Sequence, residues 1–374
     1  MIPFIDLQSQ RQKISSEIDV AITKVLDHGQ FVMGPEVTKL EENLASFSGS
    51  KYVFSCANGT DALQLALMAL GVGPGDAVFA PSFTFVATVE AVRLVGAQPV
   101  FVDVDQKTFN MCPDSLAAAV GKIVQDGELH PKAIIPVDLF GQPADYDEIL
   151  QVADRYSLKV VADAAQSFGA SYRGKNVGQL GHIATTSFFP AKPLGCYGDG
   201  GAIFTDDEEL ASEVRSLRNH GQGIDRYDNV KVGLNSRLDT IQAAILLEKL
   251  KIFPSEIINR DKVAHFYSQQ IPEELGRQVV MSGASSVWAQ YTVFCEERDS
   301  IRDGLSKLGI PTAVYYPKPN HLQTPYLSAI RSPTGLRNTE YLQERVFSLP
   351  MHPYLTEETQ TQIMTGLKNT LSSR

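Results

Sequence analysis

Cysteine is scarce in this chain. Its 374 residues include four cysteines, which stand far apart at Cys56, Cys112, Cys196 and Cys295. No C-x-x-C pair occurs, so the sequence offers neither a zinc-binding pair nor a disulfide framework. Such a pattern suits a compartment that keeps thiols reduced. We therefore expect a cytoplasmic protein without a metal site.

Long apolar runs are also missing. No run approaches the ~20 residues that a helix needs to cross a bilayer. The stretch from Met1 to Gln12 contains no basic segment followed by an apolar run and a small-residue cleavage site. These absences predict neither a membrane span nor a secretory signal.

Clustered positive charge is the third missing feature. The formal net charge is -10, the pI is near 5.3, and no run of lysine and arginine is present that could follow a phosphate backbone. Nucleic acid is therefore not an expected partner. An anionic small substrate stays open, because a few local donors decide its binding.

The chain does have enough apolar residues, 43%, to bury a large core. Two amphipathic helices are predicted first, one with Ile14, Ile18, Ile22 and Val25 on a single face and one with Val37, Leu40, Leu44 and Phe47. Short β-rich runs then alternate with helical patterns up to about residue 204. This alternation is typical of an α/β fold with a mostly parallel sheet flanked by helices. The runs lie at 52–55, 77–80, 99–102, 133–136 and 160–163.

A second domain is predicted after residue 251. Helical patterns at 208–218 and 236–250 end at Ile252, Phe253 and Pro254, where proline favours a break or hinge. We expect a large domain at 1–251 and a smaller α+β domain at 252–374. The latter should hold a helix at 255–270, a strand near 288–295, a helix at 300–308 and a last helix after Thr356.

Ligands of open α/β sheets collect at the carboxyl ends of the strands. One predicted strand ends there on Asp163, and a buried carboxylate needs a cationic or hydrogen-bonding partner. The ring nitrogen of a pyridinium cofactor would be such a partner. Alternatively, Asp163 caps a helix that begins at 164–166.

The segment after the first predicted strand, 56–61, opens a helix with Gly59 and Thr60. The free N–H groups and the dipole of a helix N-terminus suit a phosphate group. The alternative is a plain helix cap by Asn58 or Thr60.

Lys192 stands in a loop rich in proline and glycine, beyond a short strand that ends near Ser187. A buried lysine amine that loses its proton can form an imine with a carbonyl compound. The alternative is a solvated surface lysine. The Gly-Asp-Gly-Gly turn at 198–201 would let the backbone approach a ligand closely.

The last motif precedes the predicted helix at 240–250. Asn235 or Ser236 can cap that helix, and Arg237 can pair with Asp239 on the surface. Each of these signals is weak alone. Together, the helix start, the strand-end aspartate, the loop lysine and the glycine turn match the parts of a pyridoxal phosphate site.

With these motifs the chain resembles the DegT-type sugar-nucleotide aminotransferases, a branch of the fold type I pyridoxal phosphate (PLP) enzymes. The resemblance extends from 4–7 (FIDL) to 349–353 (LPMHP). It implies that Lys192 forms an imine with PLP and that Asp163 pairs with the pyridine nitrogen. It also implies cofactor contacts from Gln166 to the ring hydroxyl, from Phe85 to the ring face, and to the phosphate from Gly59, Thr60 and Ser187.

The same resemblance implies a homodimer with shared active sites, in which Asn235 reaches the phosphate of the neighbouring cofactor. Arg237, Tyr316 and His220 are expected to contact the substrate. Relatives often have histidine where this chain has Tyr315, which leaves one substrate contact open. Relatives that dehydrate their substrate carry histidine in place of Lys192, so the lysine favours transamination.

The subgroup that it resembles most aminates carbon 3 of UDP-2-acetamido-2-deoxy-3-oxo-glucuronic acid, with L-glutamate as donor, for lipopolysaccharide O-antigen. The alternatives are a 4-aminotransferase for a 4-keto-6-deoxy sugar nucleotide and a non-catalytic regulator on the same fold. A nucleotide-binding dehydrogenase is not supported, because no G-x-G-x-x-G follows the first predicted strand.

Overall fold

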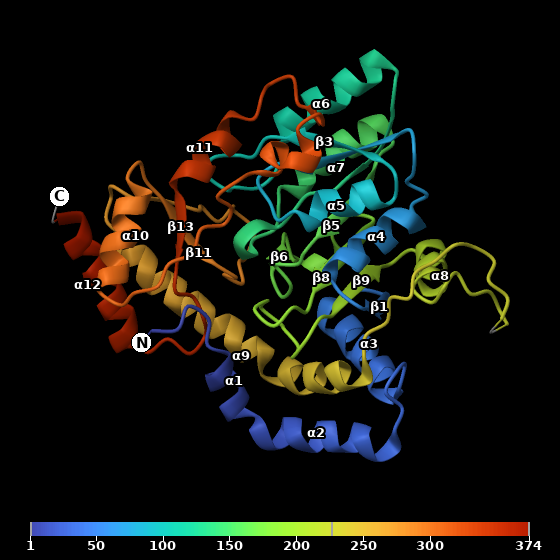
Figure 1. Cartoon of the computed structure of the whole chain (residues 1–374), viewed down its shortest axis with the longest axis horizontal. Coiled ribbons are helices and arrows are strands. Elements are labelled where there is room, and N and C mark those ends of the chain that lie inside the picture. The colour runs from blue at the N-terminus through green and yellow to red at the C-terminus, as the bar shows by residue number, and fades with distance from the viewer. Residues whose placement is uncertain (1, 226, 373–374) are drawn as a thin grey trace.

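A mostly parallel eight-stranded sheet forms the centre of the computed structural model, which describes residues 2–225 and 227–372 (Figure 1). The strand order is β1-β9-β8-β5-β4-β2-β3-β12. Neighbours from β8 to β12 run parallel, whereas β9 is antiparallel to both β1 and β8. The strands are β1 Tyr52–Cys56, β2 Asp76–Pro81, β3 Gln98–Val102, β4 His130–Ile134, β5 Lys159–Asp163, β8 Ile183–Ser187, β9 Gly201–Thr205 and β12 Ile330–Arg331.

Helices cover both faces of this sheet, because successive side chains of a strand point to opposite faces. One core joins the sheet to α3, α6, α7 and the first half of α9 (Thr240–Gln270), and the other joins it to α4, α5 and α8. The predicted α/β fold is therefore confirmed. The helices of this part are α1 Leu7–Lys13, α2 Ser15–His28, α3 Pro35–Ser48, α4 Gly59–Ala69, α5 Ala87–Leu94, α6 Pro113–Asp126, α7 Tyr146–Tyr156 and α8 Glu208–Leu217.

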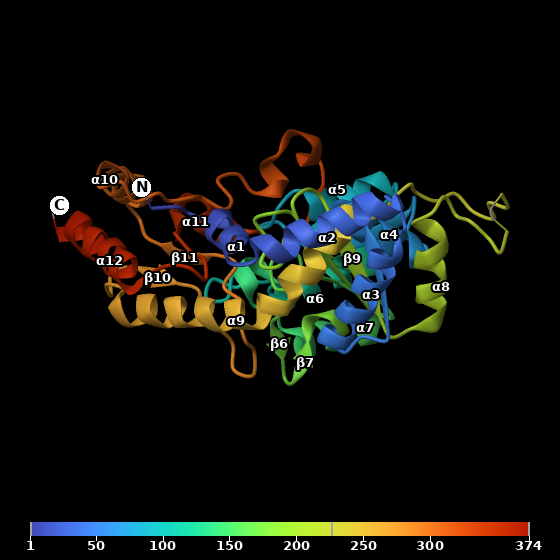
Figure 2. The same cartoon turned by 90° about the horizontal axis from the view of Figure 1, so that it is seen from below.

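Helix α9 corrects one prediction. It runs without interruption from Thr240 to Gln270 and contains Pro254, so the expected break at 252–254 is wrong. Its first half packs Leu246 and Phe253 into the large core, and its second half packs Val263 and Tyr267 into a separate core. Burial on both sides of Pro254 outweighs the helix-breaking tendency of one proline. Figure 2 shows α9 extending from the small part, beside β10 (Gly276–Arg277) and α12 (Glu357–Ser372), into the large part next to α2.

The separate core belongs to a small antiparallel sheet of order β10-β11-β13. The predicted strand near 288–295 is observed as the shorter β11, and the predicted last helix as α12. The elements here are β10 Gly276–Arg277, β11 Tyr291–Phe294, α10 Arg298–Lys307, α11 Arg337–Arg345, β13 Val346–Leu349 and α12 Glu357–Ser372. The remaining elements are a hairpin of β6 Ser171–Tyr172 and β7 Lys175–Asn176, and the 3-10 turns Leu139–Gly141, Val177–Gln179, Asn320–Leu322 and Thr324–Tyr326.

The chain crosses between these two parts more than once. Strand β12 extends the large sheet beside β3, and the backbone N–H of Asn320 donates to the carbonyl of Ser82. At the other end of the chain, the Phe4 carbonyl accepts a hydrogen bond from the Met351 N–H. A division at residue 251 stays a prediction, because segments from either side of it pack on the other part.

In the part of the chain that the structure describes, no helix combines the length and the apolar character that crossing a membrane requires. Within the same residues, no group of three or more histidine, cysteine or acidic side chains is arranged to hold a metal ion.

Candidate active site

A cavity of about 660 Å³ opens at the carboxyl ends of the central strands. Strands β1, β2, β5 and β8 run in one direction, so the segments that follow them meet at this edge. The structure brings together here, from segments far apart in the sequence, the predicted residues Gly59, Thr60, Phe85, Asp163, Gln166, Ser187, Lys192 and Tyr316.

Asp163 is the last residue of β5 and is almost fully buried. Its carboxylate accepts hydrogen bonds from the Thr88 hydroxyl at 3.0 Å and from the Ala165 N–H at 3.2 Å. No helix follows Asp163, since residues 165–169 form a turn, so the helix-cap interpretation of Asp163 is wrong. Burial raises the pKa of Asp163, while these two hydrogen bonds and Lys192 oppose the shift.

Lys192 lies in the loop that follows β8, and its backbone N–H donates to the Phe189 carbonyl at 2.8 Å. Burial lowers the pKa of the Lys192 amine, and the Asp163 carboxylate opposes this shift. The side chain lines the cavity, so the solvated-surface interpretation is wrong. A lowered pKa increases the fraction of neutral amine, which is the form that attacks a carbonyl.

The N-terminus of α4 forms another wall of the cavity. Asn58 caps this helix, since its side-chain oxygen accepts from the Asp61 N–H at 2.8 Å, whereas Thr60 lies inside the helix. The capping prediction is confirmed for Asn58 and wrong for Thr60. A Cβ on Gly59 would lie 2.7 Å from the Ser187 Cβ, so only glycine lets β8 approach this closely.

Aromatic and amide side chains complete the cavity. The Gln166 amide donates to the Tyr316 hydroxyl at 3.2 Å, and its oxygen accepts from the Phe140 N–H at 2.9 Å. The Phe85 ring, 54% exposed, lies 6.1 Å from the Tyr316 ring. The sequence reasoning missed Thr88, which holds Asp163, because nothing in its local pattern marks it.

The Gly-Asp-Gly-Gly turn packs closely against other parts of the chain. A Cβ on Gly201 would lie 2.5 Å from the Asn58 carbonyl oxygen, and one on Gly200 would lie 2.9 Å from a methyl group of Leu238. These glycines let protein segments pack against each other. A close approach of this turn to a ligand stays a prediction, and Asp199 of the turn lines the Lys192 cavity.

Asn235, Arg237 and His220 lie outside the Lys192 cavity. Arg237 and His220 line a hollow of about 670 Å³, and Asn235 lines an adjoining one of about 430 Å³. The Arg237 guanidinium donates to the Asn219 side-chain oxygen at 3.3 Å.

The structure contradicts two roles that the sequence suggested here, an ion pair for Arg237 and a helix cap by Asn235 or Ser236. Arg237 forms no ion pair with Asp239 or any other described residue. Neither Asn235 nor Ser236 caps α9, because Asp239 occupies the N-cap position. The Ser236 hydroxyl instead accepts from the Ala57 N–H at 3.2 Å.

The residues of the cavity fit pyridoxal phosphate. Among the described residues, no arginine, lysine or histidine forms an ion pair with the buried Asp163, so a pyridinium nitrogen would supply the cation that it lacks. A helix leaves its first N–H groups without partners inside the helix. Those of Gly59 and Thr60, beside Ser187, are suited to a phosphate group.

Comparison with known proteins gives the same result. The family model described as the DegT/DnrJ/EryC1/StrS aminotransferase family matches residues 12–368. A UDP-2-acetamido-2-deoxy-3-oxo-D-glucuronate aminotransferase from Pseudomonas aeruginosa is 51% identical over 99% of this chain and 100% of its own length. A pleiotropic regulatory protein from Geobacillus stearothermophilus is 43% identical over 97% of this chain and 96% of its own.

Among solved structures, a DegT DnrJ EryC1 StrS aminotransferase from Brucella abortus superposes with a TM-score of 0.97 at 50% identity, covering 99% of both chains. The resemblance predicted from the sequence is therefore confirmed, and with it the fold type I architecture and the cofactor. The chain belongs to the DegT/DnrJ/EryC1/StrS aminotransferase family and is an aminotransferase that uses pyridoxal phosphate.

Proposed function

We propose that this aminotransferase moves the amino group of L-glutamate to carbon 3 of a nucleotide-linked keto-sugar, UDP-2-acetamido-2-deoxy-3-oxo-glucuronic acid. The cytoplasmic product would enter lipopolysaccharide O-antigen synthesis. The observation that supports amino-group transfer is that a lysine amine with a lowered pKa and a buried carboxylate lie in the same cavity. The substrate rests on the Pseudomonas aeruginosa relative, which is 51% identical and named for this sugar.

Bound pyridoxal phosphate supplies an electron sink for the substrate carbon that exchanges its proton. The Asp163 carboxylate would hold the proton on the pyridine nitrogen, which keeps the ring electron-withdrawing. Lys192 would hold the cofactor, and its free amine would move the proton between the substrate carbon and the cofactor. Its lowered pKa suits a base at neutral pH.

The remaining residues bind and orient. Gly59, Thr60 and Ser187 would hold the phosphate at the N-terminus of α4. Gln166 would donate to the ring hydroxyl while the Phe140 N–H fixes its side chain. Phe85 would cover the ring face, and its own position beside Tyr316 narrows the cavity.

The proposal includes a homodimer with shared sites. Asn235, Arg237 and His220 lie outside the Lys192 cavity of their own chain, beside the half-exposed Val32 and Met33. Large apolar side chains exposed together mark interaction surfaces. In the dimer, the partner subunit's Asn235 would reach the cofactor phosphate, and the partner subunit's Arg237 would bind the uronic acid carboxylate as a two-pronged donor.

Two alternatives are tested by the same experiment. The first is amination at carbon 4 of a 4-keto-6-deoxy sugar nucleotide. The second is a regulator without catalysis, a role suggested by the name of the Geobacillus stearothermophilus relative. The complete pair of Asp163 and Lys192 argues against the second, because a regulator needs no amine of lowered pKa.

The deciding experiment incubates the protein with L-glutamate and a panel of UDP- and dTDP-linked 3-keto and 4-keto sugars. We expect a product of the UDP-linked 3-keto uronic acid whose NMR spectrum places the amine on carbon 3. Amination of a 4-keto sugar alone would establish the first alternative. No amination of any sugar, with 2-oxoglutarate also absent, would establish the second.

A further inference from the structure

Helix α9 carries a fully buried ammonium group. The Lys249 side chain is 0% exposed, its amine donates to the Gly195 carbonyl at 2.6 Å, and it lies 4.2 Å from the centre of the Tyr197 ring. Among the described residues, no carboxylate forms an ion pair with it. A buried charge without an ionic partner is costly.

Both contacts of Lys249 belong to the loop that carries Lys192. This loop folds back on itself, since the Cys196 N–H donates to the Phe188 carbonyl at 2.8 Å. A Cβ on Gly195 would lie 2.5 Å from the Pro190 carbonyl oxygen, so the backbone is closely packed there. A displacement of Gly195 would therefore be passed to Lys192, three residues earlier.

A second side chain of α9 binds the same loop. The Gln242 oxygen accepts from the Tyr197 N–H at 2.8 Å. Gln242 and Lys249 are seven residues apart, about two helical turns, and so lie on the same face of α9. The helix thus contacts the loop at Gly195 and at Tyr197, and packing of Leu246 into the large core keeps this face in place.

We propose that Lys249 is a positioning residue, which fixes the loop through Gly195 and so sets where the Lys192 amine lies relative to Asp163. This inference rests on the proposed role of Lys192. The positive charge that Lys249 needs for this role is present at neutral pH. Burial lowers the pKa of Lys249 to about 8, while Glu256 on the same helix and Cys196 in the loop oppose the shift.

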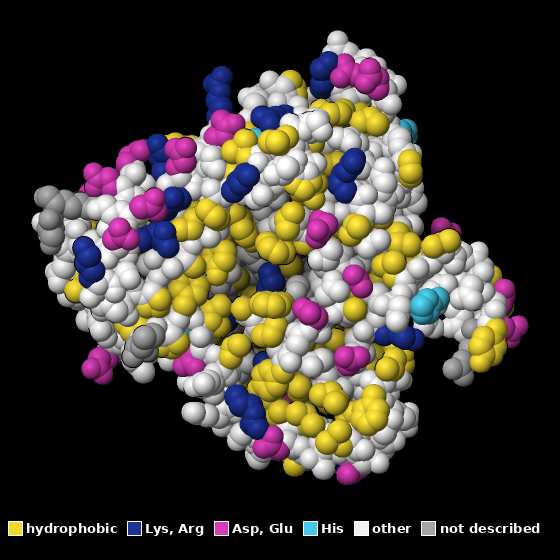
Figure 3. Space-filling view, in the orientation of Figure 1, with side chains coloured by type: hydrophobic (Ala, Val, Ile, Leu, Met, Phe, Trp, Pro, Cys, Tyr) yellow, Lys and Arg dark blue, Asp and Glu magenta, His cyan; other side chains and the backbone are white. Residues whose placement is uncertain are grey.

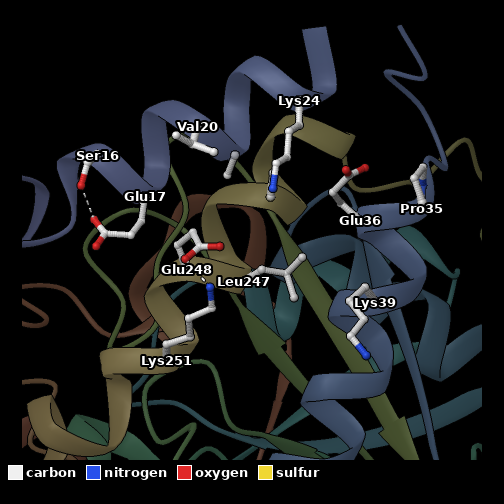
Figure 4. Close-up of a pocket in the computed structure, with 12 residues that line it drawn as sticks. Ser16, Glu17, Val20, Lys24, Pro35, Glu36, Lys39, Leu247, Glu248 and Lys251 are labelled. Atoms are coloured by element: carbon white, nitrogen blue, oxygen red, sulfur yellow. Dashed lines mark hydrogen bonds and ion pairs between the residues drawn. The ribbon is translucent and has the colours of Figure 1, made fainter. Parts of the chain in front are cut away.

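Lys251 provides a matched control two residues further along α9. It is the same residue type on the same helix, but its side chain is 66% exposed and forms an ion pair with Glu248. Figure 4 shows it at a hollow between α2, α3 and α9, which is separate from the Lys192 cavity. Lys251→Met therefore removes a charge from α9 without touching the loop.

The test compares Lys249→Met, Lys251→Met and wild type, each with cofactor bound. Hydrogen exchange of the 188–197 segment should become roughly tenfold faster in Lys249→Met alone, because its loop loses a charge-assisted anchor. In that variant kcat should fall by roughly ten- to a hundredfold with KM changed much less, since misplacement affects both half-reactions. The pH titration of the absorption band of lysine-bound cofactor should also shift.

Three outcomes would overturn the inference. One is wild-type loop exchange and kcat in Lys249→Met. Another is faster exchange throughout the chain with a lowered melting temperature, which would indicate general destabilisation. The third is the same loss in Lys251→Met. Failure of the proposed function gives a different result, since borohydride would then label a lysine other than Lys192 while the exchange data still report on the loop.

Discussion

The Lys192 cavity and the surface around Arg237 differ in how completely one chain builds them. In the cavity, Asp163 and Gln166 are buried and each has two hydrogen-bond partners within the chain. At the other place, Asn235 is exposed, and among the described residues the Arg237 side chain has one hydrogen bond, a long one to Asn219.

The apolar neighbours differ in the same way. The surface around Arg237 adjoins Phe31, Val32 and Met33, which are 48%, 50% and 44% exposed, and Figure 3 shows hydrophobic side chains gathered over α2 and the segment after it. A polar group with few partners beside exposed apolar side chains is typical of an interface. The difference fits the proposed dimer with shared sites, in which the residues around Lys192 come from one chain and the partner subunit's Asn235 and Arg237 complete the site.

The largest effect should come from Lys192→Ala. Loss of the amine removes both the covalent anchor and the base, so turnover should fall by roughly 10⁴-fold or more. The variant should keep some affinity for the cofactor through the α4 phosphate contacts. The measurement is the rate of 2-oxoglutarate release, together with a peptide map of borohydride-treated wild type. Near-normal turnover, or a label on another lysine, would contradict the proposed cavity.

Asp163→Asn should have the next largest effect. The amide has nearly the same shape but cannot hold the ring nitrogen protonated, so kcat should fall by roughly 10²-fold or more while substrate affinity changes little. Thr88→Val serves as a control, because it removes one hydrogen bond to Asp163 and leaves the carboxylate charge in place. Equal rates in wild type and Asp163→Asn would leave the carboxylate with a structural role only.

Arg237→Ala tests the proposed role of the surface around Arg237 in substrate binding. If the partner subunit's Arg237 binds the uronic acid carboxylate, kcat/KM for that sugar should fall roughly 30-fold. This corresponds to about 2 kcal/mol of transition-state stabilisation, as for a charge-assisted hydrogen bond. The glutamate half-reaction should be unchanged. Both half-reactions are measured separately by stopped-flow absorbance. Equal losses in the two, with lower thermal stability, would mean that this arginine is structural.

The smallest effect concerns the stability cost of the buried Lys249. Its pKa falls from the ordinary 10.5 to about 8, so between these pH values the unfolded chain binds more protons than the folded one. Wild-type stability should then rise with pH across this window, and the full cost is present below pH 8. Lys249→Met should be more stable than wild type at pH 7 by on the order of 1 kcal/mol, a gain that disappears towards pH 10.5. Urea unfolding at both pH values, with Lys251→Met as control, measures the difference.

Sequence patterns predicted the parts of the molecule whose pattern is local. The alternating β-rich runs predicted β1 to β5 of the central sheet but not β9 and β12. Asp163 was found because a carboxylate ending an apolar run is unusual. Lys192 could be predicted only from the motifs taken together, because nothing in the sequence around a single loop lysine shows that it is buried. Thr88, Gln242 and Lys249 were missed, because each acts on a residue more than 40 positions away and sits in an ordinary helical pattern.

The sequence by itself determined the fold class and the family and pointed to Asp163 and Lys192, because hydrophobic periodicity and short motifs are written within a few neighbouring positions. Only the tertiary structure decided that Pro254 lies inside a continuous α9 and that Asp163 does not cap a helix. It also decided that His220 lies outside the Lys192 cavity, in a hollow that Arg237 shares. These outcomes depend on which distant side chains are packed together, and burial at a site can outweigh the preference of any single residue.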